Sequence, residues 1–255
     1  MTSINKIFII QSLETKDILK SGEELSQRLS KIIPVNFQNV ETDVEVFEHL
    51  DKIRDEINLT KERYIIHFDC HGNEDGIAIF DKTDNVSFID WEDMRDKLRD
   101  IYLITKQRLI ISFSSCEGLN VVKLIAAFKP CPFELITGSF KKIGFRDSVD
   151  GYELFYKSIH KGDKLEDAMG KTRLRYPKLD FVSFPTLRLV KLGWDGYFKT
   201  QLSPDKVAER KEQIISEIIS LKGIITQPEI DFIEMGLSKE AAKKDYERYV
   251  KIFWS

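Results

Sequence analysis

The stretch Leu109–Gly118, LIISFSSCEG, decides the fold expected for this chain. Its first half, Leu109–Phe113, is a short apolar run that ends at two serines and a cysteine. A run of this kind, bounded by a turn signal, is typical of a strand buried on both faces of a parallel sheet. Cys116 therefore follows the end of a central strand. In open α/β sheets, ligands and chemistry are found at the carboxyl ends of such strands.

A second buried run, Tyr64–Phe68, leads into Asp69-Cys70-His71-Gly72. Two buried strands thus end in a thiol and an imidazole. A thiol is a good nucleophile only as the thiolate, and His71 could remove its proton. A helix predicted to begin near Leu119 would add positive potential at Cys116. This combination points to acyl transfer: attack on a peptide carbonyl, a thioester intermediate and its hydrolysis.

The rest of the chain predicts an α/β fold. Strand and helix patterns alternate from the first strand, Lys6–Ile10, which indicates a parallel sheet with helices on both sides. After His71, two short strands form a predicted hairpin, and further strands complete the sheet. The predicted strands after His71 are Gly76–Phe80, Val86–Ile89, Leu109–Phe113, Phe133–Thr137, Phe181–Phe184 and Leu187–Leu192.

The C-terminal part has a different pattern. From Ser203-Pro204-Asp205, a strong helix start, the sequence is wholly helical to Ser255. We therefore predict two domains, an α/β domain over residues 1–200 and a helical extension over residues 201–255 that serves regulation or partner docking.

Composition excludes several classes of partner. The 255 residues carry 39 basic and 42 acidic side chains, a net charge of −3, so no nucleic acid or anionic membrane is expected as a partner. No signal peptide or membrane-spanning run is seen, which predicts a soluble protein. The three cysteines form no CxxC pair, which favours a reducing, cytoplasmic setting. We expect no cofactor and no metal.

The order of these motifs resembles that of the caspase-like (clan CD) cysteine peptidases, and most closely their CHAT-domain group. His71 and Cys116 are 116 − 71 = 45 residues apart, similar to the spacing of about 50 in caspases. The resemblance covers about Lys6–Leu192. Its four blocks, in order, are YIIHFDCHG, VSFIDWEDMRDKL, LIISFSSCEG and the segment from Ile136 to Arg173.

The resemblance implies a three-layer α/β/α sandwich with a mostly parallel central sheet, and a hydrolase activity. Cys116 would be the nucleophile, and His71 the general acid/base that protonates the leaving amine. The backbone N–H groups of Gly72 and Cys116 would form the oxyanion hole. Such a protease would cleave a protein partner in a regulated pathway (stress, cell death or anti-phage defence), and an activating protein partner is expected.

For the residue that orients His71 and for the substrate pocket, the sequence supports only weaker predictions. Proximity suggests that Asp69 orients His71. Ser114 stands where caspases have a glutamine that helps to bind aspartate, so the usual charge preference is not encoded there. A substrate pocket could be formed by Ser114, Ser139, Lys141, Lys142 and Arg146. The three basic residues would make it a basic pocket, or they would simply be a solvated loop.

Alternative interpretations stay open at this point. Free cysteine is often a small core residue, and His67 is expected to be a core histidine. Cys70, His71 and Cys116 have residue types that suit zinc, although their spacing fits no familiar ligand pattern. The chain could also be an inactive caspase-like scaffold that binds a protein partner. A Rossmann-like nucleotide-binding module is disfavoured, because no glycine-rich phosphate motif follows a strand.

Overall fold

The computed structural model of this chain describes residues 3–17, 19–57, 62–73, 75–105, 108–114, 131–139 and 144–254. The chain forms two compact units, Met1–Thr186 and Leu187–Ser255. The first unit contains the sheet and the residues of the candidate site that the structure describes. The second consists of helices.

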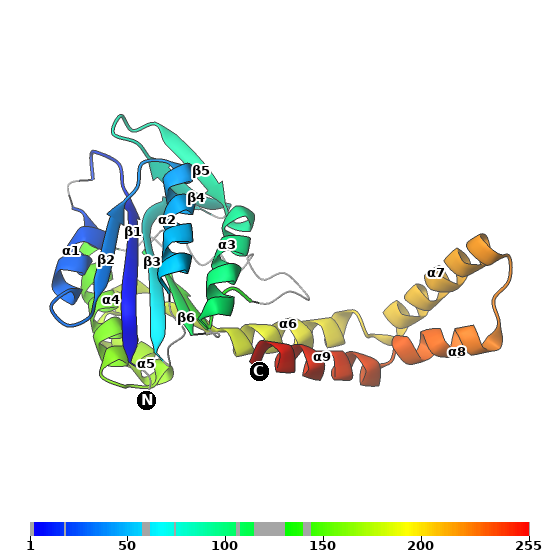
Figure 1. Cartoon of the computed structure of the whole chain (residues 1–255). Coiled ribbons are helices and arrows are strands. Elements are labelled where there is room, and N and C mark those ends of the chain that lie inside the picture. Colours follow the sequence, from blue (N-terminus) through cyan, green and yellow to red (C-terminus); the bar gives the residue numbers. More distant parts are fainter. Residues whose placement is uncertain are drawn as a thin grey trace. The chain divides into compact units, whose positions relative to one another are not determined.

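The first unit is built on a mostly parallel sheet with the strand order β2-β1-β3-β6-β7-β8 (Figure 1). Neighbouring strands from β2 to β7 run parallel, and only β8 is antiparallel to its neighbour on this path. The strands are β1 (Ile4–Ser12), β2 (Val35–Asn39), β3 (Arg63–Gly72), β6 (Leu109–Phe113), β7 (Leu135–Gly138) and β8 (Val182–Pro185). The predicted α/β class and its mostly parallel sheet are confirmed.

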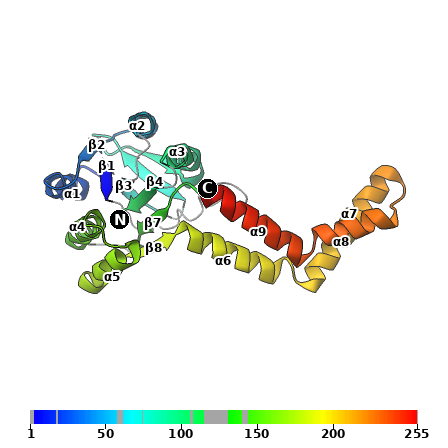
Figure 2. The ribbon, with the colours of Figure 1, turned by 60° about the horizontal axis from the view of Figure 1, so that its bottom comes forward.

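Helices cover both faces of this sheet, which confirms the three-layer arrangement (Figure 2). In this view α1, α4 and α5 lie on one side of the sheet, and α2 and α3 lie on the other. The helices are α1 (Ser21–Leu29), α2 (Asp43–Glu56), α3 (Trp91–Ile104), α4 (Phe145–His160) and α5 (Leu165–Arg175).

Alternation along β3 decides which side chains reach the site. Successive side chains of a strand point to opposite faces of the sheet. Ile65 packs in the core with α1 and α4, whereas Phe68 stacks on Phe113 on the opposite face, at 5.0 Å between ring centroids. His67, Asp69 and His71 have the parity of Ile65 and therefore belong to the α1/α4 face.

A small hairpin follows His71, as the sequence predicts. It consists of β4 (Gly76–Phe80) and β5 (Val86–Asp90), and β4 pairs antiparallel with the end of β3. Gly76 is required at the start of β4, because a Cβ atom there would lie 2.0 Å from the carbonyl oxygen of Ile89.

The second unit begins earlier than the sequence predicts. Its helices are α6 (Thr186–Thr200), α7 (Pro204–Lys222), α8 (Gln227–Gly236) and α9 (Lys239–Trp254). The predicted domain boundary at residue 200 lies at the end of α6, whereas the compact units divide between Thr186 and Leu187.

The predicted strand Leu187–Leu192 is also wrong, because these residues are the first half of α6. Its apolar residues recur at helical spacing as well, and Trp194 of α6 packs on Tyr246 of α9 at 5.4 Å between ring centroids. These residues are helical in a segment whose contact with α9 cannot be predicted from the local sequence.

Across the described part of the chain, none of the helices has the length and apolar character that crossing a membrane requires.

Candidate active site

The two strands that precede the ends of the predicted site are neighbours in the sheet. β3 and β6 are parallel neighbours, paired from Tyr64 with Leu109 to Phe68 with Phe113, an offset of 109 − 64 = 45 residues. The amide of Ser114 continues this ladder by donating to the carbonyl oxygen of Phe68 at 2.8 Å. His71 and Cys116 are separated by the same offset, 116 − 71 = 45. Cys116 itself lies outside the described residues.

His71 lies at the end of β3 with its side chain about two-fifths exposed. Its Nε2 is 2.9 Å from Oδ2 of Asp17, and its ring packs edge-on against Phe80 of the hairpin at 5.6 Å between centroids. Because a carboxylate only accepts hydrogen bonds, Nε2 carries the hydrogen in this pair. In the neutral ring Nδ1 is then an acceptor, and no other described residue occupies it.

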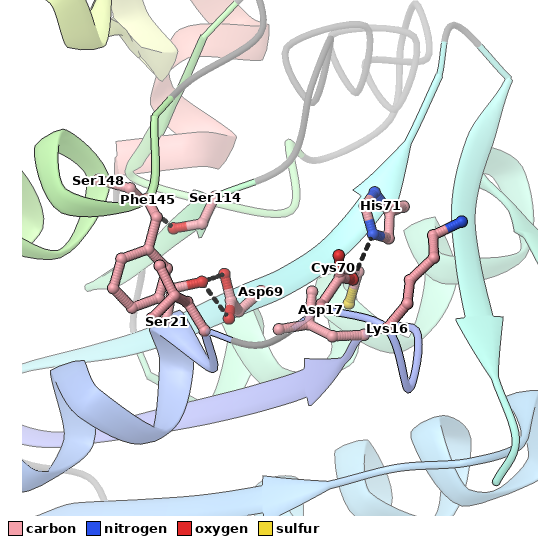
Figure 3. A pocket seen from close by; sticks show the side chains of 11 residues that line it. Lys16, Asp17, Ser21, Asp69, Cys70, His71, Ser114, Phe145 and Ser148 are labelled. Carbon is pink, nitrogen blue, oxygen red and sulfur yellow. Dashed lines mark hydrogen bonds and ion pairs between the residues drawn. The ribbon is translucent and has the colours of Figure 1, made fainter. Parts of the chain in front are cut away.

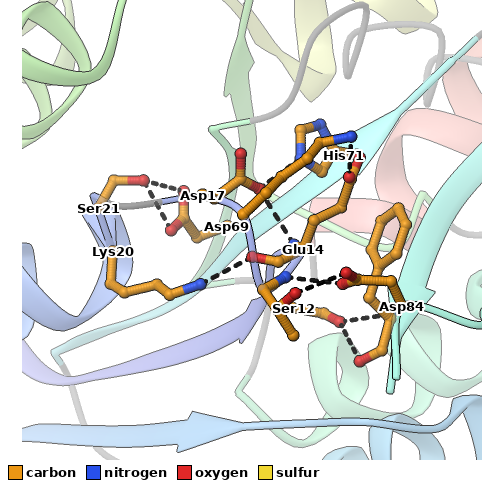
Figure 4. A network of polar contacts seen from close by, with 11 residues as sticks. Ser12, Glu14, Asp17, Lys20, Ser21, Asp69, His71 and Asp84 are labelled. Atoms are coloured by element: carbon orange, nitrogen blue, oxygen red, sulfur yellow. Dashed lines mark hydrogen bonds and ion pairs between the residues drawn. The ribbon is translucent and has the colours of Figure 1, made fainter. Parts of the chain in front are cut away.

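Asp17 belongs to a loop that the hairpin holds in place (Figure 4). The amide and hydroxyl of Thr15 donate to the two carboxylate oxygens of Asp84 in the hairpin turn, at 2.7 and 2.5 Å. Within the loop, the amide of Glu14 donates to Oδ2 of Asp17 at 3.0 Å. The hairpin therefore contributes a ring contact to His71 and an anchor for its carboxylate partner.

Asp69 does not have the role that proximity suggests. Its carboxylate accepts hydrogen bonds from the Ser21 hydroxyl, at 2.8 Å to Oδ2, and from the Gly22 amide at 2.6 Å. Both donors belong to the first turn of α1. The predicted orientation of His71 by Asp69 is therefore replaced by the bond to Asp17, 54 residues upstream in a polar loop that carries no recognisable motif.

The environment of Asp69 is unusual for a carboxylate. The residue is only 1% exposed, and burial raises the pKa of its carboxyl group to about 6, against hydrogen bonds from Ser21 and Gly22 that lower it. A buried carboxylate with a perturbed pKa beside a cavity is a feature of functional sites as well as of structural networks.

The amide of Gly72 is directed toward the side of β3 on which β6 lies. The carbonyl of Phe68 faces β6, since it accepts from the Ser114 amide, and backbone groups alternate in direction along a strand. Gly72 lies four residues later and has the same direction. Its pair with Ile77 of β4 is not hydrogen-bonded, because the adjacent Asn73 amide donates to the Gly76 carbonyl. This N–H therefore points into the space between the ends of β3 and β6.

His67 is buried, as expected, and it joins a chain of polar groups beneath the site. Its Nδ1 lies 2.7 Å from the Tyr156 hydroxyl, and its Nε2 lies 2.8 Å from the hydroxyl of Ser114. Burial lowers the pKa of His67 to about 3, so the ring is neutral at pH 7. Ser114 is also 3.1 Å from the hydroxyl of Ser148 on α4. The sequence pattern indicated burial of His67 and gave no sign of this bond to Ser114.

A cavity of about 380 Å³ opens between these groups (Figure 3). In that view Asp69, Ser21 and Phe145 lie at one end and His71 with Asp17 at the other. The lining residues are Leu13, Lys16, Asp17, Leu19, Ser21, Asp69, Cys70, His71, Ser114, Phe145 and Ser148. The segment between β1 and α1, the ends of β3 and β6, and the start of α4 thus meet there.

The predicted substrate pocket is only partly the one observed. Ser114 lines the cavity, whereas Ser139 is buried after β7 and Arg146 is exposed on α4, and neither lines it. Lys141 and Lys142 lie outside the described residues. Sequence reasoning missed the segment between β1 and α1, whose polar residues resemble an ordinary solvated loop.

The alternative zinc site of Cys70, His71 and Cys116 is disfavoured by strand geometry, because Cys70 and His71 are adjacent in β3 and point to opposite faces. Burial raises the pKa of the Cys70 thiol, which keeps it protonated. Within the described ranges, no three His, Cys, Asp or Glu side chains gather as metal ligands do.

Comparison with known proteins adds no assignment. Neither a protein-family model nor a curated protein matches this sequence.

Proposed function

We propose that the chain is a caspase-like cysteine endopeptidase of the CHAT type, with Cys116 as nucleophile and His71 as general acid/base. The observation that carries this proposal is the shared offset of 45 residues. His71 lies at the end of β3, and the chain reaches Cys116 two residues after Ser114, the last described residue after the neighbouring strand β6. Peptide geometry keeps the Cα atoms of residues two apart within about 7 Å.

The described groups supply the remaining parts of the chemistry. His71 Nδ1 accepts the proton of the Cys116 thiol as sulfur attacks the scissile carbonyl carbon, and Asp17 at Nε2 stabilises the resulting imidazolium. The Gly72 amide donates to the oxyanion. The C–N bond then breaks, and the imidazolium gives its proton to the leaving amine. Water, deprotonated by His71, hydrolyses the thioester and regenerates the thiol.

The biological setting proposed for this activity is a regulated one. Related caspase-like domains act on protein partners and are stimulated by an activating partner. We propose the same here, with a basal rate of cleavage that such a partner raises, in a stress, cell-death or anti-phage defence pathway in the cytoplasm. The helical unit is the candidate regulatory or docking element. The competing proposal, an inactive scaffold, requires neither the His71–Asp17 pair nor a free Nδ1.

Cleavage of a peptide library tests this proposal. Wild-type protein is compared with Cys116→Ala, His71→Ala and the control Cys131→Ala, which removes a buried thiol distant from His71 in the sequence. We expect cleavage by wild type and Cys131→Ala, and loss of cleavage in the two site variants. Cleavage that persists in Cys116→Ala would contradict the assignment.

A further inference from the structure

We propose that the cavity beside His71 binds a cationic side chain, arginine or lysine, of the peptide substrate, with Asp69 as its counter-charge. This inference rests on the proposed peptidase function, since it names the substrate class of the same site. It reverses the preference for acidic substrates that a basic pocket of Lys141, Lys142 and Arg146 would give.

Asp69 has acceptor capacity left for such a ligand. A carboxylate offers about four acceptor positions. Among the described residues, two donor groups occupy them, the single hydroxyl hydrogen of Ser21, shared between Oδ1 and Oδ2, and the amide hydrogen of Gly22 on Oδ2. Oδ1 therefore remains open to a guanidinium or ammonium group that enters the cavity.

Among the described residues, Asp69 has no ion-pair partner, although His71 is near enough to lower the pKa of its carboxyl group. Lys16 lines the cavity, but its ammonium pairs with Glu14 and points away from Asp69 (Figure 3). His71 is paired with Asp17. None of the described lysines and arginines forms an ion pair with Asp69. A buried carboxylate without a cation is costly, and a cationic ligand would offset that cost.

The rest of the lining suits a long cationic side chain. Leu13, Leu19 and Phe145 supply apolar surface against which the methylene groups of lysine or arginine can pack. The hydroxyls of Ser114 and Ser148 add further hydrogen-bonding oxygens. A volume of about 380 Å³ is near the lower end of ligand pockets, about 300–1,000 Å³, and suits one side chain.

The described lining of this cavity is less favourable for an acidic side chain. Arg146 does not line it, and the first turn of α1, which could attract an anion, already faces the carboxylate of Asp69. An anion there would lie beside Asp69 and Asp17 and would be repelled by both.

Binding of small probes tests this inference without any cleavage. The full chain carrying Cys116→Ala is titrated by calorimetry or NMR with acetyl-arginine amide, acetyl-lysine amide, acetyl-norleucine amide and acetyl-glutamate amide. We expect the two cationic probes to bind at least about tenfold more tightly than the others. No binding of the cationic probes at millimolar concentration, or tighter binding of the glutamate probe, would overturn the inference.

Two sets of variants locate the binding. Asp69→Asn keeps an oxygen for the Gly22 amide and should weaken binding of the cationic probes about tenfold or more, whereas Asp93→Asn, which removes an exposed carboxylate at the start of α3, should not. Leu19 is 53% exposed and lines the cavity, so Leu19→Lys should fold and repel the cationic probes, while Leu19→Gln should retain them. Equal affinities across these variants would place the cation elsewhere and refute the role of Asp69.

The cleavage assay with the peptide library distinguishes failure of the proposed peptidase function from failure of the proposed cation site. If the cationic probes bind and no Cys116-dependent cleavage is found, the cation site stands and the peptidase function fails. If Cys116-dependent cleavage occurs after acidic or apolar residues alone, the peptidase function stands and the cation site fails.

Discussion

At the scale of single residues, the pairing of His71 with Asp17 is the central contact of the site. The bond fixes the hydrogen on Nε2 and leaves Nδ1 as the basic nitrogen. Asp69, nearer in sequence, is engaged by the first turn of α1. Two carboxylates that line the same cavity thus differ in their contacts: Asp17 bonds to the imidazole of His71, and Asp69 does not.

Asp17→Asn should reduce turnover strongly and KM little. Without the carboxylate, the imidazolium formed on attack is less stable and the tautomer of His71 is no longer fixed, so we expect kcat to fall about 100-fold or more. Steady-state kinetics on a cleaved peptide checks this. Lys16→Ala, a neighbouring change, should leave kcat within about twofold of wild type, and an equal loss in both variants would contradict the role of Asp17.

Asp69→Asn should alter stability in a pH-dependent way. The folded protein holds the carboxyl proton more tightly than the unfolded chain, since the pKa is raised from 3.8 to about 6, so Asp69 lowers stability as pH rises from about 4 to about 6. Relative to wild type, the free energy of unfolding of the variant should rise by about 2–3 kcal/mol between pH 4 and pH 7. Urea unfolding at the two pH values measures this difference. A pH-independent difference would show that the pKa of Asp69 is unshifted.

At the scale of elements, the β4–β5 hairpin links sheet and site. It pairs with the end of β3, packs Phe80 on His71 and anchors the loop of Asp17 through Asp84. Its own geometry depends on Gly76.

Gly76→Ala should therefore damage both stability and activity. The added Cβ would lie 2.0 Å from the Ile89 carbonyl, so the strands must separate, at a cost of about 1–3 kcal/mol. Gly170→Ala in α5 is the matched control, because nothing lies within 4 Å of its Cβ, and it should be neutral or stabilising by up to about 1 kcal/mol. Urea unfolding of both variants gives the comparison. Equal stabilities would argue against the hairpin geometry.

The elements were more predictable than the contacts between them. Apolar runs such as Leu109–Phe113 and the hairpin after His71 could be predicted, because buried strands and turns leave local patterns. The helix over Leu187–Leu192 could not, because its apolar spacing fits a strand as well as a helix. The Asp17–His71 and Ser114–His67 bonds could not either, since they join residues 54 and 47 positions apart, and only the sheet topology brings them together.

At the scale of the whole molecule, the two compact units have separate tasks in the proposed function. The sheet unit carries every described residue of the candidate site, and the helical unit, Leu187–Ser255, has contacts of its own. Within that unit, Trp194 packs against Tyr246 and Tyr249 of α9.

Trp194→Ala should therefore weaken the helical unit selectively. Loss of the aromatic contacts between α6 and α9 should cost about 2 kcal/mol or more. Hydrogen exchange followed by mass spectrometry should show faster exchange in α6 and α9, with β3 and β6 unchanged. Faster exchange in β3 and β6 as well would show that the two units unfold together.

The most direct test of the central claim is the alkylation rate of Cys116 by iodoacetamide, followed by mass spectrometry at pH 7. A nucleophile paired with His71 should be alkylated faster than the buried Cys70 and Cys131 and at least about tenfold faster than in His71→Ala, because the thiolate is the reacting form. If Cys116 is unreactive, or reacts at the same rate with and without His71, the proposed catalytic pair does not exist.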